Sequence, residues 1–212
     1  MTRLRLLQIT LAVLSLPLLC SAREAPDDFV EVVKLDPSIA IELPYATKNN
    51  FCKRKLYSIE RCFLRREVAE ALIKVQKDLK KHGYSLKIWD GYRPRSVQWE
   101  MWEHSPIPNF VGDPRYGSKH NRGAAVDVTL VTAGDHKYVE MPTPYDEFTH
   151  RAHANFIDVR KEIAERRILL QQMMRKHGFH TIQSEWWHFN YKNWRNFPLE
   201  DVSLQELVDR QR

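Results

Sequence analysis

The segment AAVDVTLV, residues 124–131, constrains the fold of this chain more than any other stretch. Its β-favouring residues and its alternation predict a strand. Val126, Val128 and Leu130 share one face, whereas Asp127 and Thr129 share the other. An aspartate in such a strand is costly unless it is paired or coordinates a cation. The strand therefore predicts a sheet with one apolar face and a functional site on the other.

Helical and extended patterns follow one another along the 212 residues without a regular strand–helix–strand alternation. The clearest helix is residues 64–82, where apolar side chains recur at helical spacing and Gly83 follows as a cap. The apolar face consists of Val68, Leu72, Val75 and Leu79. Further helices are expected at 94–104 and 159–176, strands at 85–92, 179–183 and 186–191, and two extended segments within 29–47. We expect one α+β domain, residues 23–212, with a mainly antiparallel sheet, helices packed on one side and a peripheral tail after Pro198.

The N-terminus has the three-part layout of a secretory signal peptide. Residues 1–5 contain two arginines, an apolar run follows at 6–19, and residues 20–22 are small. The run is shorter than the roughly 20 apolar residues of a membrane-spanning helix. We expect residues 1–22 to be removed and the mature domain to be exported, to the periplasm or beyond, without stable membrane insertion. The alternatives are lipid attachment through Cys20 and a buried first helix.

Cys52 and Cys62 would remain after removal of the signal. Two cysteines in an exported chain favour a loop-closing disulfide, and two buried free thiols are the alternative. Neither is interpreted as a metal ligand. The formal charge is +6, but the basic residues are interleaved with acids on predicted helices. We interpret them as solvated helix faces, so no nucleic-acid partner is expected. The sequence leaves the oligomeric state open.

Two motifs contain ionisable residues that suit a metal site. SKHNRGAAVD, residues 118–127, places His120 and Asp127 on either side of a turn at Gly123. SEWWHFNY, residues 184–191, places Glu185 on a loop or bulge before the strand of His188, beside two tryptophans. Each motif alone also has a plainer interpretation, as a structural His–Asp hydrogen bond or as an aromatic core strand.

Together the motifs supply His120, Asp127 and His188. Two imidazoles and one carboxylate suit a zinc ion, one per chain, with a fourth position left for water, although manganese and cobalt stay open. Glu185 could take a proton from that water and pass it to a leaving amine. Arg93, which precedes a proline that restrains its backbone, could stabilise an oxyanion. The alternative for Arg93 is a structural ion pair with Asp90.

The patterns S-x-H-x-x-G-x-A-x-D and E-x-W-H, in this order, resemble those of the zinc peptidases related to lysostaphin, D-alanyl-D-alanine metallopeptidases and Hedgehog. The stretches YATKNNF (45–51), LKIWDGYRP (86–94) and TPYDEF (143–148) are similar to the VanX-type D-alanyl-D-alanine dipeptidases. The resemblance spans residues 29–194 and implies zinc-dependent hydrolysis of a small D-,D-dipeptide.

The resemblance also implies roles for individual residues. By this match the zinc ligands are His120, Asp127 and His188, the general base is Glu185, and the arginine that stabilises the transition state is Arg93. The residues implied to line the substrate pocket are Tyr45, Asp90, Ser118 and Asp146. Our hypothesis is that Asp146 holds the substrate ammonium.

Two departures from the antibiotic-resistance members bear on function. Residues 95–117 form a shorter segment, so one pocket wall is expected to differ. The export signal predicts a role outside the cytoplasm, in cell-wall turnover or D-alanine recovery. One alternative is a D,D-carboxypeptidase or endopeptidase acting on longer wall peptides. Another is a non-catalytic zinc-containing binding module, against which the presence of both Glu185 and Arg93 argues.

Overall fold

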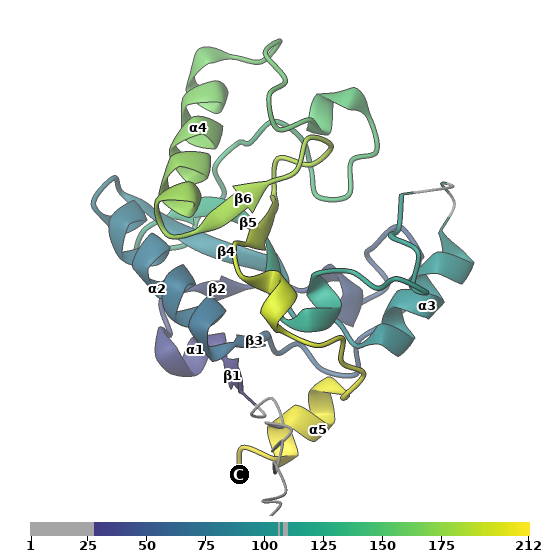
Figure 1. Cartoon of the computed structure of the whole chain (residues 1–212). Helices are drawn as coiled ribbons and strands as arrows, with labels where there is room; N and C mark the ends of the chain where they lie inside the picture. The colour runs from purple at the N-terminus through teal and green to yellow at the C-terminus, as the bar shows by residue number, and fades with distance from the viewer. Residues whose placement is uncertain (1–27, 106, 108–109) are drawn as a thin grey trace, which may run out of the picture.

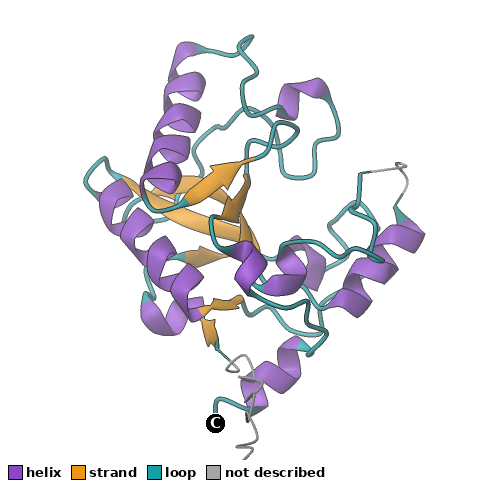
Figure 2. Cartoon of the chain, in the orientation of Figure 1, coloured by secondary structure: helices purple, strands orange, loops and turns teal. Residues whose placement is uncertain are grey.

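The computed structural model describes residues 28–105, 107 and 110–212. A five-stranded sheet in the order β2-β4-β5-β7-β6 forms its centre (Figures 1 and 2). These strands are β2 (Ala40–Ile41), β4 (Tyr84–Asp90), β5 (Ala125–Thr132), β7 (His188–Tyr191) and β6 (Phe179–Thr181). Only β2 and β4 run parallel, and β1 (Phe29–Glu31) and β3 (Phe63–Arg65) form a separate antiparallel pair. The predicted α+β class with a mainly antiparallel sheet is confirmed. The predicted signal peptide and Cys20 lie outside the described residues.

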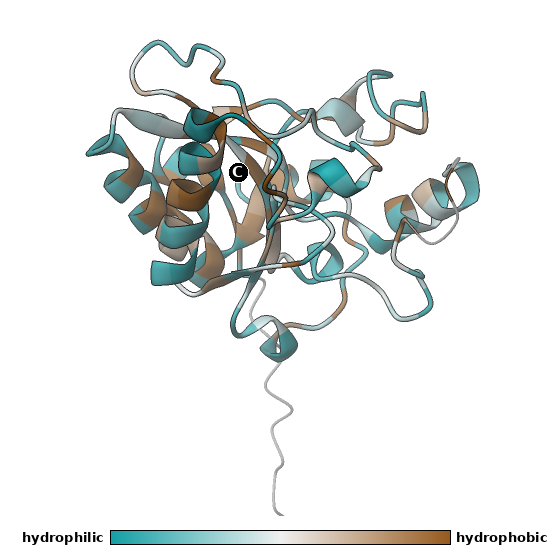
Figure 3. Ribbon diagram, turned by 90° about the horizontal axis from the view of Figure 1, so that it is seen from above, coloured by the Kyte–Doolittle hydropathy of each residue, from teal (hydrophilic) through white to brown (hydrophobic). Residues whose placement is uncertain are grey.

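Two long helices, α2 (Arg66–Lys80) and α4 (Lys161–Lys176), contact each other and cover one side of the sheet (Figure 1). The predicted apolar face of α2 is fully buried: Val68, Leu72, Val75 and Leu79. Figure 3 shows hydrophobic residues between these helices and the strands and hydrophilic residues on the outer sides. Helix α3 (Arg95–His104) lies away from this pair. The candidate site combines residues of β5 and β7 with residues of the surrounding loops.

The N-terminal and C-terminal segments differ from expectation. Residues 29–47 contain, besides short strands, the helix α1 (Val32–Leu35) and a 3-10 turn. The tail after Pro198 is not peripheral, because it ends in α5 (Leu204–Asp209), whose apolar residues are buried. Leu204, Leu207 and Val208 lie at helical i, i+3, i+4 spacing among charged residues, and this spacing is what buries them together.

The expected disulfide is wrong: Cys52 and Cys62 are both free and buried. The Cys62 sulfur packs against Gly91, where a Cβ would approach it to 2.6 Å, and Cys52 Sγ lies 4.0 Å from the Met101 carbonyl oxygen of α3. The two thiols therefore belong to different packing environments, and burial raises the pKa of Cys52 to about 11. Among the described residues, no helix has the length and apolar character needed to span a membrane.

Candidate metal centre and active site

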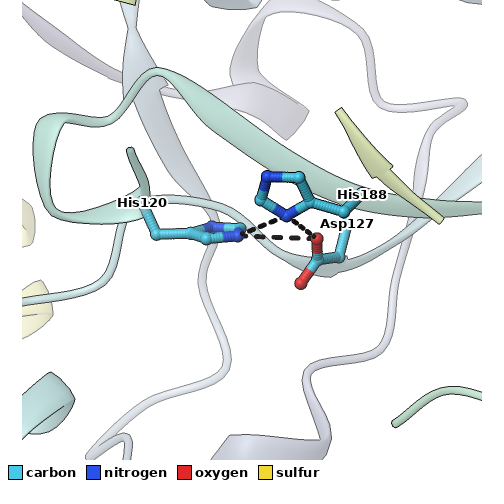
Figure 4. Close-up of side chains that lie close together, drawn as sticks. All are labelled: His120, Asp127 and His188. Atoms are coloured by element: carbon cyan, nitrogen blue, oxygen red, sulfur yellow. Dashed lines mark hydrogen bonds and ion pairs between the residues drawn. The ribbon is translucent and has the colours of Figure 1, made fainter. Parts of the chain in front are cut away.

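Three side chains from two distant parts of the chain converge at one end of the sheet (Figure 4). His120 begins the 3-10 turn η2 (His120–Arg122), Asp127 lies in β5, and His188 begins β7. Asp127 and His188 are directly opposite each other in the antiparallel β5–β7 register. Because directly opposed residues on paired strands are close neighbours, the sheet itself brings these two together. The turn before β5 then brings His120 to them.

Gly123 allows the short connection between His120 and β5. Its φ is 65°, in the left-handed region that glycine adopts without a Cβ penalty. Its N–H donates to the His120 carbonyl, and its own carbonyl accepts the Arg65 N–H, both at 3.0 Å. A Cβ at this position would lie 2.4 Å from Cε1 of Phe29. The motif therefore needs glycine both for its backbone conformation and for its space.

The separations of the three inward atoms suit a shared cation. His188 Nδ1 lies 2.9 Å from Asp127 Oδ1, and His120 Nε2 lies 3.2 Å from His188 Nδ1 and 3.5 Å from Asp127 Oδ1. Zinc bonded tetrahedrally to nitrogen and oxygen at about 2.0–2.1 Å separates its ligand atoms by about 3.3 Å. All three side chains are buried. The atoms therefore fit as ligands of one small divalent cation.

The outward nitrogens of the two imidazoles fix which nitrogens face the cluster. His120 Nδ1 lies 2.7 Å from the Gly91 carbonyl oxygen, and His188 Nε2 lies 2.9 Å from Oδ1 of Asn190. These oxygens only accept hydrogen bonds, so the two outward nitrogens carry the protons in the neutral rings. The lone pairs of the inward nitrogens then face the Asp127 oxygen. Three acceptors that face one another are the arrangement a bound cation satisfies.

The electrostatics of the cluster follow from burial and mutual contact. Burial alone would raise the pKa of Asp127, but the charge and hydrogen bonds of His120 and His188 hold that pKa well below its usual range. Burial lowers the pKa of His188, but its hydrogen bond with Asp127 and the charge of Asp127 outweigh burial and raise the pKa to about 9. Protons and a cation therefore compete for the same inward-facing nitrogen lone pairs.

Arg93 lines the cavity beside this cluster, and hydrogen bonds to two buried side chains fix its guanidinium. Its Nε and Nη2 donate to Oδ2 of Asp90 at 3.1 and 2.5 Å, and its Nη1 donates to Oε1 of Gln98 at 2.7 Å. Asp90 also accepts from the Tyr57 hydroxyl at 2.6 Å. Asp90 was expected to line the substrate pocket, but it is completely buried behind Arg93 and does not line the cavity. Arg93 can therefore form the ion pair with Asp90 and still present its guanidinium to the cavity.

Glu185 lies on the loop before β7, as predicted, with Oε2 3.8 Å from His188 Nδ1. It lines the same cavity of about 250 Å³ as Arg93 and the three clustered residues. Burial is the main reason that its pKa is raised, and the nearby charge of Asp127 adds to the effect. A carboxyl group with a raised pKa beside a possible metal site is suited to accept and return a proton.

Tyr45, Asp146 and Ser118 also line this cavity. The Tyr45 hydroxyl donates to the Asp146 carboxylate, with oxygen distances of 3.0 and 3.1 Å, and the Ser118 N–H donates to Asn121 Oδ1. Burial raises the pKa of Asp146 well above its ordinary value, and the negative charge of Asp127 raises it further. A positively charged substrate group beside Asp146 would therefore stabilise its ionised form.

The sequence reasoning missed Tyr145, Gln98 and Asn190. Tyr145 donates from its hydroxyl to Oδ2 of Asp127 at 2.8 Å. Asn190 had a detectable signal, because it lies two residues after His188 on a strand and therefore faces the same side. Gln98 and Tyr145 contact the site through tertiary packing alone, although Tyr145 directly precedes Asp146 in sequence.

A set of candidate metal-ligating atoms on the sheet, with a carboxyl group and an arginine beside it, is the arrangement expected of a metal-dependent hydrolase. The chain belongs to the peptidase M15 family, whose model, described as D-Ala-D-Ala dipeptidase, matches residues 26–202. The predicted resemblance is thereby confirmed, and the protein is a metallopeptidase of this family.

Curated relatives carry the same description. The chain is 35% identical over 173 residues to the D-alanyl-D-alanine dipeptidase of Escherichia coli K12, covering 81% of this chain and 89% of the relative. It is 30% identical over 183 residues to that of Enterococcus faecium, covering 77% and 88%.

Similar solved structures include the vancomycin-resistance D,D-dipeptidase VanXYg in complex with a D-Ala-D-Ala phosphinate analogue, at 20% identity and a TM-score of 0.42. That match covers 72% of this chain and 61% of the other. The LD-carboxypeptidase LdcB is 20% identical, with a TM-score of 0.43, and its match covers 87% and 78%.

Proposed function

We propose that this protein hydrolyses D-alanyl-D-alanine to two D-alanines, with one zinc ion held by His120, Asp127 and His188. Family membership supports the dipeptidase reaction. The observation that carries the metal assignment is the convergence of two imidazole nitrogens and one carboxylate oxygen within 3.5 Å of one another. Bound zinc would polarise the peptide carbonyl and lower the pKa of an attacking water to about 7.

In this proposal, Glu185 moves the proton. Its carboxylate accepts a proton from the attacking water and then donates it to the departing amine, so one residue acts first as base and then as acid. Its position beside His188 and its raised pKa support this role. Arg93 directs its guanidinium at the carbonyl oxygen as negative charge develops there. Asp90 and Gln98 hold that guanidinium in place.

The substrate is a free dipeptide in this proposal. The cavity of about 250 Å³ is small, and drug-sized ligands occupy pockets of about 300–1,000 Å³. Asp146 receives the substrate ammonium, supported by the Tyr45 hydroxyl. An N-acylated peptide has no ammonium and would leave the Asp146 carboxylate without a partner of opposite charge.

Replacement of Glu185 tests the chemistry. We expect Glu185→Gln to retain one zinc per chain by metal analysis, since Glu185 is not in the ligand set, while hydrolysis of D-Ala-D-Ala falls by about 10²–10⁴-fold. The wild type is expected to cleave D-Ala-D-Ala and to leave N-acetyl-D-Ala-D-Ala intact. Equal cleavage of both peptides would point to a carboxypeptidase. A zinc-loaded wild type that cleaves neither would point to a binding module.

We also propose that the protein is exported and acts in cell-wall turnover or D-alanine recovery. The basic, apolar and small-residue layout of residues 1–22 supports export. N-terminal sequencing of the protein recovered from its native host should begin at Arg23. A chain that begins at Met1 and fractionates with the cytoplasm would contradict export.

A further inference from the structure

We propose that Tyr145 is a positioning residue for the metal centre, because its hydroxyl holds Asp127 in the orientation that presents Oδ1 to the two imidazoles. This inference rests on the proposed zinc function, since it assigns a partner to one of the three proposed ligands. Tyr145 lies in the loop between β5 and α4, outside the strands that supply Asp127 and His188.

The two oxygens of Asp127 have different partners. Oδ1 faces His188 Nδ1 and His120 Nε2, whereas Oδ2 accepts the Tyr145 hydroxyl at 2.8 Å. Asp127 is only 3% exposed, so solvent can contribute little in place of that donor. Loss of the hydroxyl would leave a buried carboxylate oxygen unsatisfied and free the carboxylate to rotate about its terminal torsion. The hydroxyl therefore decides which oxygen faces the imidazoles.

The Tyr145 ring is held by aromatic residues on the strands of the site. It stacks on Trp89 of β4, with ring centroids 4.9 Å apart and an interplanar angle of 27°. It also meets Trp187, directly before β7, edge to face at 5.6 Å. These contacts fix the ring independently of its hydroxyl. A phenylalanine at this position would keep the same packing and lose only the hydrogen bond.

The neighbouring Tyr45 shows how the donors are divided. The Tyr145 oxygen lies 3.2 Å from the Tyr45 oxygen, and Tyr45 is within 3.0–3.1 Å of both Asp146 oxygens. Each phenol has one proton to donate. The assignment that satisfies both carboxylates gives the Tyr45 proton to Asp146 and the Tyr145 proton to Asp127. The Tyr45 hydroxyl thus supports Asp146, the proposed substrate-binding residue, and the Tyr145 hydroxyl supports Asp127, the proposed metal ligand.

The test compares zinc affinity in three tyrosine-to-phenylalanine variants, each titrated against a chromogenic chelator at one pH. We expect Tyr145→Phe to weaken zinc binding by about 10–100-fold, the usual effect of removing a partner of a metal ligand. Tyr45→Phe should leave the zinc dissociation constant within about twofold and raise KM instead. The matched control is Tyr191→Phe, because the buried Tyr191 also donates to a carboxylate, that of Glu67 at 2.9 Å. Tyr191 lies three residues after His188 in β7 and therefore faces the opposite side of the sheet.

A second measurement uses the cobalt-substituted protein. Its visible absorption should change in Tyr145→Phe and stay as in the wild type in Tyr191→Phe, because only the first variant frees the Asp127 carboxylate. Thermal melts of the metal-free proteins check that each variant folds. A folded Tyr145→Phe whose zinc affinity and cobalt spectrum match the wild type would overturn the positioning role. A wild type that binds no zinc would overturn the proposed function itself.

Discussion

Gly123 and Gly83 offer a matched pair that tests whether the turn of the metal motif is sterically closed. Both have positive φ, 65° and 79°. A Cβ at Gly83 would meet nothing within 4 Å, whereas one at Gly123 would approach the Phe29 ring to 2.4 Å. Phe29 has little freedom to move away, because its ring centroid lies 4.4 Å from that of Tyr92 and the Arg65 guanidinium lies over the Phe29 ring. Alanine therefore has the same backbone penalty at both positions, whereas only the alanine at position 123 also has a steric clash.

The magnitudes follow from these two contributions. The left-handed conformation costs an alanine about 1–2 kcal/mol at either position. The smaller entropy of the unfolded alanine chain offsets part of this cost, about 0.4–1 kcal/mol, equally in both variants. Overpacking adds a further cost of about 1–3 kcal/mol at Gly123 alone. Gly123→Ala should therefore lose about 1–3 kcal/mol more stability than Gly83→Ala.

Urea unfolding of the metal-free proteins measures this difference without a contribution from bound zinc. With a urea dependence of about 1–3 kcal/mol/M, the midpoint of Gly123→Ala should fall on the order of 1 M below that of Gly83→Ala. Gly123→Ala should also bind zinc more weakly, since the turn positions His120. Equal midpoints for the two variants would refute the steric argument, because backbone conformation alone would then account for both.

Two further predictions concern charge. Arg93→Lys should lower kcat by about 10²–10³-fold with zinc binding unchanged, because lysine lacks the planar fork that keeps the cation aimed at the oxyanion; a kcat within threefold of the wild type would contradict this role. Hydrogen bonds from Lys176, Lys81 and His177 lower the pKa of Asp78 below its ordinary value of 3.8. The ionised Asp78 therefore stabilises the fold above about pH 4, and this stabilisation is lost as the pH falls further. Asp78→Asn should have a lower melting temperature than the wild type at pH 7, and the difference should become smaller at about pH 2–3. A difference that does not change with pH would show that the charge of Asp78 does not cause the stabilisation.

Local periodicity made much of the fold predictable. The buried face of α2 depends on residues within a few positions of one another, so it can be predicted from the sequence alone. The extended pattern of β5 is local in the same way, although the strand is buried on both faces. The strands β6 and β7 were predictable for the same reason, although both are shorter in the structure than the ranges 179–183 and 186–191 expected from the sequence. The three candidate metal ligands were proposed only when the two motifs were taken together, and the family resemblance then implied the same set. Their convergence depends on the pairing of β5 with β7, which no local pattern specifies.

The missed features depend on contacts between distant segments. The tail is anchored where the Glu200 N–H donates to the Asn121 carbonyl and the Tyr92 hydroxyl donates to the Val202 carbonyl. No composition rule identifies such partners. Tyr145 reaches Asp127 from an irregular loop, in which the following residue, Asp146, adopts a positive φ of 56°. Side-chain networks of this kind are set by tertiary structure, so sequence patterns identify the candidate ligands but not the residues that support them.

The balance of charge in the cavity connects the proposed metal with the proposed substrate. Asp127, Glu185 and Asp146 all line it, and the charge of Arg93 is already paired with Asp90. Burial and mutual repulsion raise the pKa values of Glu185 and Asp146. A divalent cation at the histidine cluster and an ammonium at Asp146 would supply three positive charges against these three carboxylates. With an acylated peptide only the two charges of the metal would remain, whereas the C-terminal carboxylate is common to both peptides. The electrostatics that favour the cation therefore also favour a substrate with a free amino terminus.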